Sequence, residues 1–150
     1  MVKDIIGNVV SAIMIVVMLF VTPMYYVGII QWARDESQAL AWTRAVVDEV
    51  IDSKELVDST LEEYNIKMAS LSTYYNTTIT RQKKITNPAY DGDGTYTSYV
   101  TIDDNRHYDQ GDLVIIHVKQ IGAPLYQAIA RVLLGAQMPS DEFTIPGRVR

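Results

Sequence analysis

Residues 5–33 read IIGNVVSAIMIVVMLFVTPMYYVGIIQWA and contain no charged side chain; Asp4 and Arg34 are the charges that flank this run. As an α-helix with a rise of ~1.5 Å per residue, the run is longer than the ~30 Å hydrocarbon core of a bilayer. A helix in the core of a soluble protein rarely continues this far without a charged face, because one of its sides meets water. The run therefore predicts a transmembrane anchor helix over residues 1–33.

A secretory signal peptide is the alternative interpretation of this run. Such a peptide has an apolar region of about 7–15 residues that ends at small residues in an A-x-A-like pattern. Here the apolar part is longer, and Tyr25, Tyr26 and Trp32 follow in place of a cleavage signature. Aromatic rings are typical of the membrane interface, where their polar ends meet the headgroups. We therefore expect an uncleaved anchor, with a kink but no break at Pro23.

The orientation of the anchor is predicted from its place in the chain, because its flanking charges do not decide it. Lys3 and the terminal amine lie on one side and Arg34 and Arg44 on the other, so the positive-inside rule gives a near tie. A span at the start of a chain that continues into a domain usually leaves that domain exported. We expect a single-pass cell-membrane protein with its N-terminus inside and its domain outside.

Composition excludes several classes of function. The formal net charge of −5 and the pI of about 4.9 argue against a nucleic-acid partner, which needs clustered Lys and Arg to displace counterions. The chain has no cysteine, so it has no disulfide framework, no thiolate nucleophile and no cysteine-based zinc site.

Beyond Arg34 the helical pattern continues without interruption. The segment ARDESQALAWTRAVVDEVIDSKEL has neither Gly nor Pro and is rich in good helix formers. An apolar stripe recurs at helical spacing along it. Its members are Leu40, Val47, Val50 and Ile51. This stripe must pack on something, and the domain's own sheet, a neighbouring copy and another protein all remain open.

The rest of the chain predicts a small α+β domain over residues 34–135. A second helix is expected within residues 53–73, where Ser59 and Glu62 have the spacing of a capping box. The expected strands are residues 76–85, 95–102 and 113–120. The first is threonine-rich and suits a polar edge strand, whereas the last is the most β-branched and suits the centre of a sheet.

A final helix is expected after Pro124, with Gly135 as its C-cap. Its only basic residue is Arg131, so packing on the sheet is favoured over binding to a membrane surface. Residues 136–150 contain two prolines and are expected to form a flexible tail. The predicted fold is thus α+β: a long transmembrane helix continues into an amphipathic helix, which packs with an antiparallel sheet of about three strands and a C-terminal helix.

Acidic residues crowd two of the expected loops and raise the question of calcium. They are Asp91, Asp93, Asp103, Asp104, Asp109 and Asp112. An EF-hand loop that starts at Asp91 needs a bidentate Glu at its twelfth position, where Ile102 stands. Solvated turns that use Asp and Gly for their backbone preferences are therefore favoured over a calcium site.

Catalytic signatures are not found in the sequence. His107 and His117 lack the helical spacing of a metal site, and no G-x-S-x-G, G-x-x-x-x-G-K-[ST] or G-x-G-x-x-G pattern occurs. We therefore predict no catalytic residue, no metal and no cofactor, and we do not expect an enzyme.

The layout of the chain resembles that of the TadE-like and TadG-like minor pilins of tight-adherence pilus systems, within the broader pilin-like group. The resemblance lies in the N-terminal span, its aromatic and basic exit over residues 25–34 and the following segment QALAWTRAVVDEV. The late segment GDLVIIHVKQIGAPLYQAIARVLLG is similar to the family's closing strand and helix. Together these parts cover residues 8–55 and 111–135. The exit helix has fewer alanines than is usual, and no prepilin cleavage site is evident.

This resemblance implies a non-catalytic subunit of a cell-envelope pilus or secretion apparatus. Such a subunit would contact membrane lipid and associate with copies of itself or with other pilus or secretion subunits. The association is expected through the N-terminal helix, at the residues of its span, its exit and its apolar stripe. The alternative is a single-span membrane-anchored binding or assembly protein of another envelope or conjugation machine.

Overall fold

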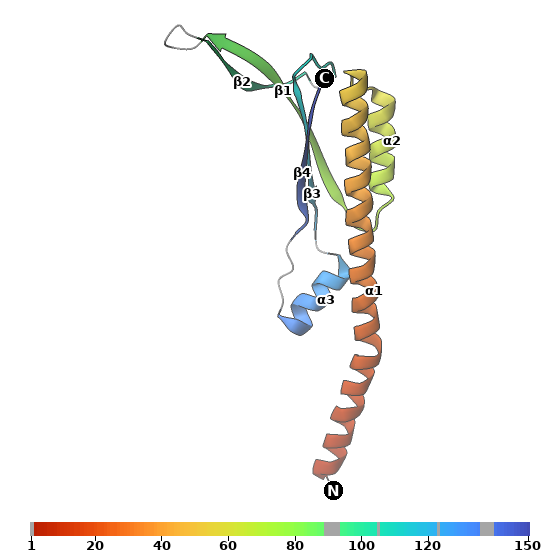
Figure 1. Cartoon of the computed structure of the whole chain (residues 1–150). Coiled ribbons are helices and arrows are strands. Elements are labelled where there is room, and N and C mark those ends of the chain that lie inside the picture. The colour runs from red at the N-terminus through yellow and green to blue at the C-terminus, as the bar shows by residue number, and fades with distance from the viewer. Residues whose placement is uncertain (1, 89–93, 105, 123, 136–139) are drawn as a thin grey trace. The chain divides into compact units, whose positions relative to one another are not determined.

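The computed structural model of the chain describes residues 2–88, 94–104, 106–122, 124–135 and 140–150. Within these residues it is an α+β protein with helices and an antiparallel sheet (Figure 1). The elements are α1 (Val2–Ser53), α2 (Asp58–Ala69), β1 (Tyr75–Pro88), β2 (Thr95–Ile102), β3 (Leu113–Gln120), α3 (Leu125–Leu134) and β4 (Glu142–Arg148). The chain divides into two compact units, residues 1–34 with 123–139 and residues 35–122 with 140–150.

Helix α1 is continuous through Pro23, so the predicted absence of a break is confirmed. A proline removes one backbone hydrogen bond, and the long apolar segments on both sides keep the remaining ladder intact. The helix ends at Ser53, where Lys54 takes a left-handed conformation with φ of 61°. That conformation is a common way to stop a helix, and it turns the chain toward α2.

Helix α2 confirms the second predicted helix but not its predicted start. It begins at Asp58 after Val57, and no side chain caps its first turn. The capping box expected from Ser59 and Glu62 is therefore not used, because Ser59 already lies inside the helix. Asp58 in the first turn places a negative charge where the helix dipole favours it.

The second unit contains a four-stranded sheet in the order β2-β1-β3-β4, with every neighbouring pair antiparallel. The central position predicted for β3 is confirmed. Strand β1 was expected at an edge but lies inside the sheet, since residues 75–82 pair with β3 and residues 81–88 pair with β2. Its polar composition is compatible with this position because its buried Arg81 has charged partners, described below.

Strand β4 corrects the prediction of about three strands and places residues 142–148 of the predicted flexible tail, 136–150, in the sheet; residues 136–139 of that tail lie outside the described residues. Phe143, Ile145 and Gly147 alternate with more exposed residues, which is the pattern of a strand with one covered face. Pro146 obscured this pattern in the sequence. The backbone of Val149 bonds to the β3 side of the sheet, through Gly111 N–H and Asp112 O, so by alternation Pro146 faces the free edge. Proline is tolerated at an edge because no ladder hydrogen bond is lost there.

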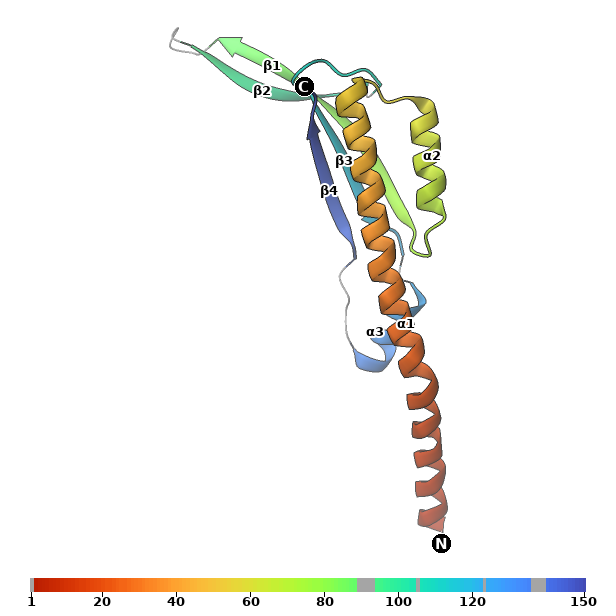
Figure 2. The same cartoon turned by 45° about the vertical axis from the view of Figure 1, so that its right-hand side comes forward.

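The core of the second unit lies between one face of this sheet and the two helices, α2 and the part of α1 after Arg34 (Figures 1 and 2). Strand β3 buries alternate residues toward the helices. The buried apolar residues are Ala39, Val46, Val47, Val50, Leu56, Tyr64, Met68, Leu71, Tyr108, Val114, Ile116, Val118 and Val149. Tyr64 and Thr43 share a buried hydrogen bond of 2.8 Å, which satisfies both hydroxyl groups inside this core.

Candidate membrane interface

The N-terminal part of α1 exposes apolar side chains on all of its faces. In the part of the chain that the structure describes, it belongs to the one helix that is long and apolar enough to cross a membrane. None of its most apolar stretch is buried inside the protein. Each large apolar side chain left in water forgoes about 1.5–3 kcal/mol of burial free energy, so this surface is poorly matched to water. The predicted apolar helix is confirmed in this coarse sense.

The residues predicted at the end of the span lie on neighbouring turns of α1. Pro23 and Tyr26 are exposed, and Tyr25 is half-buried. The rings of Tyr25 and Tyr26 meet edge to face, with centroids 6.2 Å apart and planes at 67°. Trp32 is half-buried because the ring of Tyr126 lies beside it, at a centroid distance of 6.5 Å. These aromatic rings form a band along the last turns of the charge-free run.

Helix α3 packs against this band, a contact that was not predicted. A Cβ atom placed on Gly28 would overlap the Cβ atom of Tyr126 and lie 2.8 Å from its Cγ atom. The absent side chain of Gly28 thus lets α3 approach α1 closely (Figures 1 and 2). Tyr126 and Ala130, four residues apart, form the buried stripe of α3. The expectation that this helix packs on the sheet is therefore corrected: it groups with residues 1–34.

We expect Gly28→Val to release α3 from α1. The added side chain overlaps Tyr126, and a helix as short as α3 is marginal in water without tertiary packing. Amide hydrogen exchange of residues 125–134, measured on the full chain in detergent, should become several-fold faster. Gly7→Val is the matched control, because a Cβ at Gly7 meets no atom within 4 Å. Equal rates of amide exchange in the Gly28→Val and Gly7→Val variants would show that α3 does not depend on the contact between Gly28 and Tyr126.

The apolar stripe of α1 is covered by the chain itself. Val50 is fully buried and Val47 nearly so, while Leu40 and Ile51 are half-buried. Val47 and Ile51 lie against the backbone of Gly147 in β4. The sequence left open whether this stripe packs on the domain's own sheet, on a neighbouring copy or on another protein, and in the structure it packs on the domain's own sheet. Intrachain packing thus covers Val47 and Val50, while Leu40 and Ile51 stay partly exposed, and association through this stripe stays a prediction.

Asp35 begins the second unit and fixes its α2–β1 connection. The carboxylate is buried, and its Oδ2 atom accepts a 2.9 Å hydrogen bond from the backbone N–H of Thr73. A buried carboxylate is costly unless it is bonded, so this contact ties the start of the domain to the segment before β1. The sequence pattern around Asp35 contains no signal for this role.

A charged cluster around Arg81 holds the loop before β3. Arg81 is 6% exposed and donates from Nε to Oδ2 of Asp112, 2.8 Å away, while Asp112 itself is 1% exposed. The backbone N–H groups of Lys84 and Asp109 also donate to Asp112. The Arg81 guanidinium further lies 3.1 Å from the Asp109 carboxylate and over the ring of Tyr108. Every charge in the buried part of this cluster thus has a partner.

Protonation in this cluster is shifted by burial and by Arg81. Burial alone raises the pKa of Asp112, but hydrogen bonds from the Lys84 and Asp109 backbones and from Arg81 outweigh it and lower the pKa below 3.8. Burial raises the pKa of Tyr108 to about 12, although Arg81 opposes this rise. At neutral pH the carboxylate is therefore charged and the phenol neutral, which suits an internal ion pair and not proton transfer.

Of the acidic residues that were considered as calcium ligands, some contact Arg81 and others lie outside the described residues. Asp104, Asp109 and Asp112 all have an oxygen within 4 Å of the Arg81 guanidinium, which occupies the place that a cation would take. Asp91 and Asp93 lie outside the described residues. Over the ranges that the structure covers, no group of three or more His, Cys, Asp or Glu side chains is arranged to hold a metal ion.

The two histidines have local partners. His117 Nδ1 lies 2.9 Å from Thr144 Oγ1, and its Nε2 lies 3.1 Å from Glu142 Oε1 across the β3–β4 pair. His107 Nε2 lies 3.5 Å from Glu55 on the surface. Each contact joins adjacent backbone segments, as cross-strand polar pairs commonly do.

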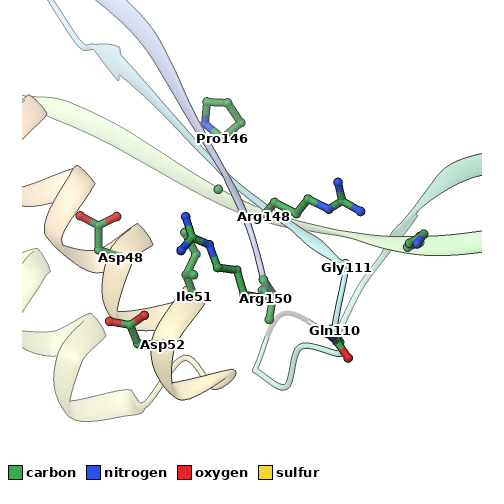
Figure 3. A pocket seen from close by; sticks show the side chains of 11 residues that line it. Asp48, Ile51, Asp52, Gln110, Gly111, Pro146, Arg148 and Arg150 are labelled. Atoms are coloured by element: carbon green, nitrogen blue, oxygen red, sulfur yellow. The ribbon is translucent and has the colours of Figure 1, made fainter.

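A polar groove of about 1120 Å³ runs between α1 and the end of β4 (Figure 3). Asp48 and Asp52 lie on its α1 wall, and Arg150 reaches toward that wall, whereas Arg148 points away. Its remaining lining includes Lys84 and Gln110 but no histidine and no hydroxyl side chain. Among the described residues that line it, the groove holds opposite charges but no nucleophile and base held together.

Comparisons of the chain with protein-family models, with curated proteins and with solved structures found no match. No relative therefore supplies a family, an activity or a partner. The function is inferred from the exposed apolar helix and from what packs on it.

Proposed function

We propose that the chain is a single-span membrane protein with its N-terminus inside and its α+β domain outside the cell membrane. The observation that carries the proposal is the change in environment along α1. Its side chains are apolar and mostly exposed through the charge-free run, and from Ala39 onward one stripe of them is buried against the chain's own sheet and α2. Lipid is the solvent that suits the first part, and water suits the domain.

We further propose that this protein is a non-catalytic, pilin-like subunit of a cell-envelope pilus or secretion apparatus, as the resemblance to TadE-like proteins implies. Because the stripe at Val47 and Val50 is occupied by intrachain packing, association falls to the exposed span. Asn8, Ser11 and Ala12 offer small or polar contacts there, and helices in membranes associate through such residues. Lateral packing of the spans would place copies side by side in a filament.

A second candidate, a membrane-anchored binding protein of another envelope machine, is favoured by the hairpin arm, defined as residues 83–88 and 95–100. The arm extends past β3, so its two strands have only each other as sheet neighbours (Figure 1). Tyr96, Tyr99 and Val100 are exposed on it, and β2 has no charge, Pro or Gly to block its free edge. Such an edge accepts an added strand from a partner.

Photocross-linking in native membranes separates the two candidates. A photoreactive residue is placed at Ile13 or Met18 in the span, at Tyr99 in the arm, and at Ile66, an exposed apolar residue of α2 that serves as the control. A filament subunit should give a ladder of self-adducts from Ile13 or Met18. A binding protein should give one heterologous adduct from Tyr99 and no ladder.

Two results would count against the proposal. Self-adducts from Ile66 as strong as those from Ile13 would indicate random collision instead of packing through the span. Release of the chain from membranes by alkaline carbonate would remove the anchor itself, since a spanning helix stays with the lipid.

A further inference from the structure

Among the side chains of α3 that the structure describes, three stripes are made of residues four apart. Tyr126 and Ala130 are buried against α1. Gln127 and Arg131 form a polar stripe on one side of this contact, since each step of one residue turns a helix by ~100°. The third stripe, one step farther round, is apolar and exposed, and its Val132 is 82% exposed. An apolar stripe left open next to a polar one is typical of a helix that lies on a membrane surface.

The contact with α1 sets the level of α3 along the span. Tyr126 packs on Gly28 and Trp32, and both belong to the charge-free run that ends at Ala33. If that run crosses the bilayer, its last turns lie at the boundary between acyl chains and headgroups. The open stripe of α3 then lies at the level of this boundary, on the face of the helix that is turned away from α1.

We infer that α3 is a second membrane-binding element, which lies on the lipid surface beside the span with the stripe of Ala128 and Val132 in the acyl region and Arg131 among the headgroups. The inference rests on the proposed single-span anchor. Freely diffusing interfacial helices need several basic residues, but α3 has only Arg131. It needs fewer because α1 already holds it at the surface, so its own lipid contact is an intramolecular step.

Lipid accounts for the open stripe better than a protein partner does. The described part of the stripe is Ala128 and Val132, and the area that these two residues can bury is far below the ~1,200 Å² of a stable protein–protein interface. It lies on the face of α3 opposite Tyr126 and Ala130, so the contact with α1 leaves it exposed to whatever surrounds the span. The single positive charge at Arg131 also matches anionic headgroups.

Spin labels on single cysteines test this placement, and the cysteine-free chain needs no background substitution. The full chain is labelled at Val132→Cys, Gln127→Cys, Ile13→Cys and Thr97→Cys and placed in phosphatidylcholine/phosphatidylglycerol nanodiscs. Collision with oxygen, which partitions into lipid, is compared with collision with a water-soluble nickel chelate. We expect the ratio of oxygen to nickel collisions to be several-fold higher at Val132 than at Gln127, approaching the ratio at Ile13, while Thr97 behaves as aqueous.

The other outcomes overturn the inference in distinguishable ways. A water-like ratio at Val132 with a lipid-like ratio at Ile13 would remove α3 from the membrane and leave the span in place. A water-like ratio at both sites would remove the span as well. A label at Val132 shielded from both reagents would show that protein, either a second copy or another subunit, covers the stripe instead of lipid.

Discussion

Replacing Asp112 by alanine should lower the free energy of unfolding of the sheet-containing unit by about 3–5 kcal/mol, the loss usually seen when one partner of a buried ion pair is removed. The change leaves Arg81, which is almost fully buried, without its closest carboxylate. It also deprives the backbone N–H groups of Lys84 and Asp109 of their acceptor. One substitution thus leaves three donors without their carboxylate acceptor, one of them a buried guanidinium N–H.

Urea unfolding of the full chain in nanodiscs, followed by Trp42 fluorescence in a Trp32→Phe background, measures this loss. Asp109→Ala is the matched control, because that carboxylate also lies 3.1 Å from Arg81 but its side chain is 67% exposed. An exposed ion pair contributes about 0–1 kcal/mol, so the control should lose little. Equal losses in the two variants would contradict the importance of burial in this cluster.

The pH dependence of the free energy of unfolding follows from the same ion pair, Arg81 and Asp112. The pKa of Asp112 is lowered below 3.8 in the folded state, so its stabilising contribution is present above that value and is lost as the pH falls through the folded pKa. The difference in stability between the natural chain and Asp112→Ala should therefore be constant near neutral pH and narrow in acid. If the difference in stability between the natural chain and Asp112→Ala narrows as the pH rises, the stabilisation comes from a group other than the Asp112 carboxylate.

Gly147→Ala should destabilise the same unit by about 1–3 kcal/mol through overpacking. The new methyl group would overlap Val47 Cγ1 and lie 2.9 Å from Ile51 Cδ1, so β4 and α1 would have to move apart. Both valine and isoleucine are stiff, branched side chains, which limits local relaxation. The same urea titration reports the loss as a lower midpoint.

A double-mutant cycle with Val47→Ala shows whether the overlap between the added methyl group and Val47 causes the loss of stability. Shortening Val47 alone leaves a cavity and costs stability, but in the Gly147→Ala background it makes room for the added methyl group. The double variant should therefore lose less than the sum of the two single losses. Strict additivity would mean that Gly147 acts through its backbone and not through contact with Val47.

Local patterns were sufficient to predict the elements with strong periodicity. The charge-free run and the Gly- and Pro-free segment after it predicted one long helix, and α1 is continuous over both. The β-branched segment at Leu113–Gln120 predicted a central strand, and β3 is central. In these segments composition and spacing agree with the burial that the fold requires, so tertiary contacts do not override them.

Features that depend on contacts distant in sequence could not be predicted. Arg81 and Asp112 gave no local sign that they would pair, and without that pair β1 resembles an edge strand. Strand β4 was hidden because Pro146 breaks the usual composition of a strand, although it lies harmlessly on a free edge. The packing of Tyr126 on Gly28 brings together residues almost a hundred positions apart, where helical periodicity carries no information.

The order of β3, α3 and β4 along the chain has a consequence for biogenesis. The two strands are neighbours in the sheet, but α3 separates them in sequence, so one edge of β3 stays bare until residues 142–148 arrive. A nascent chain therefore presents an unsealed hydrogen-bonding edge, which is prone to misassembly, until its last strand has been made.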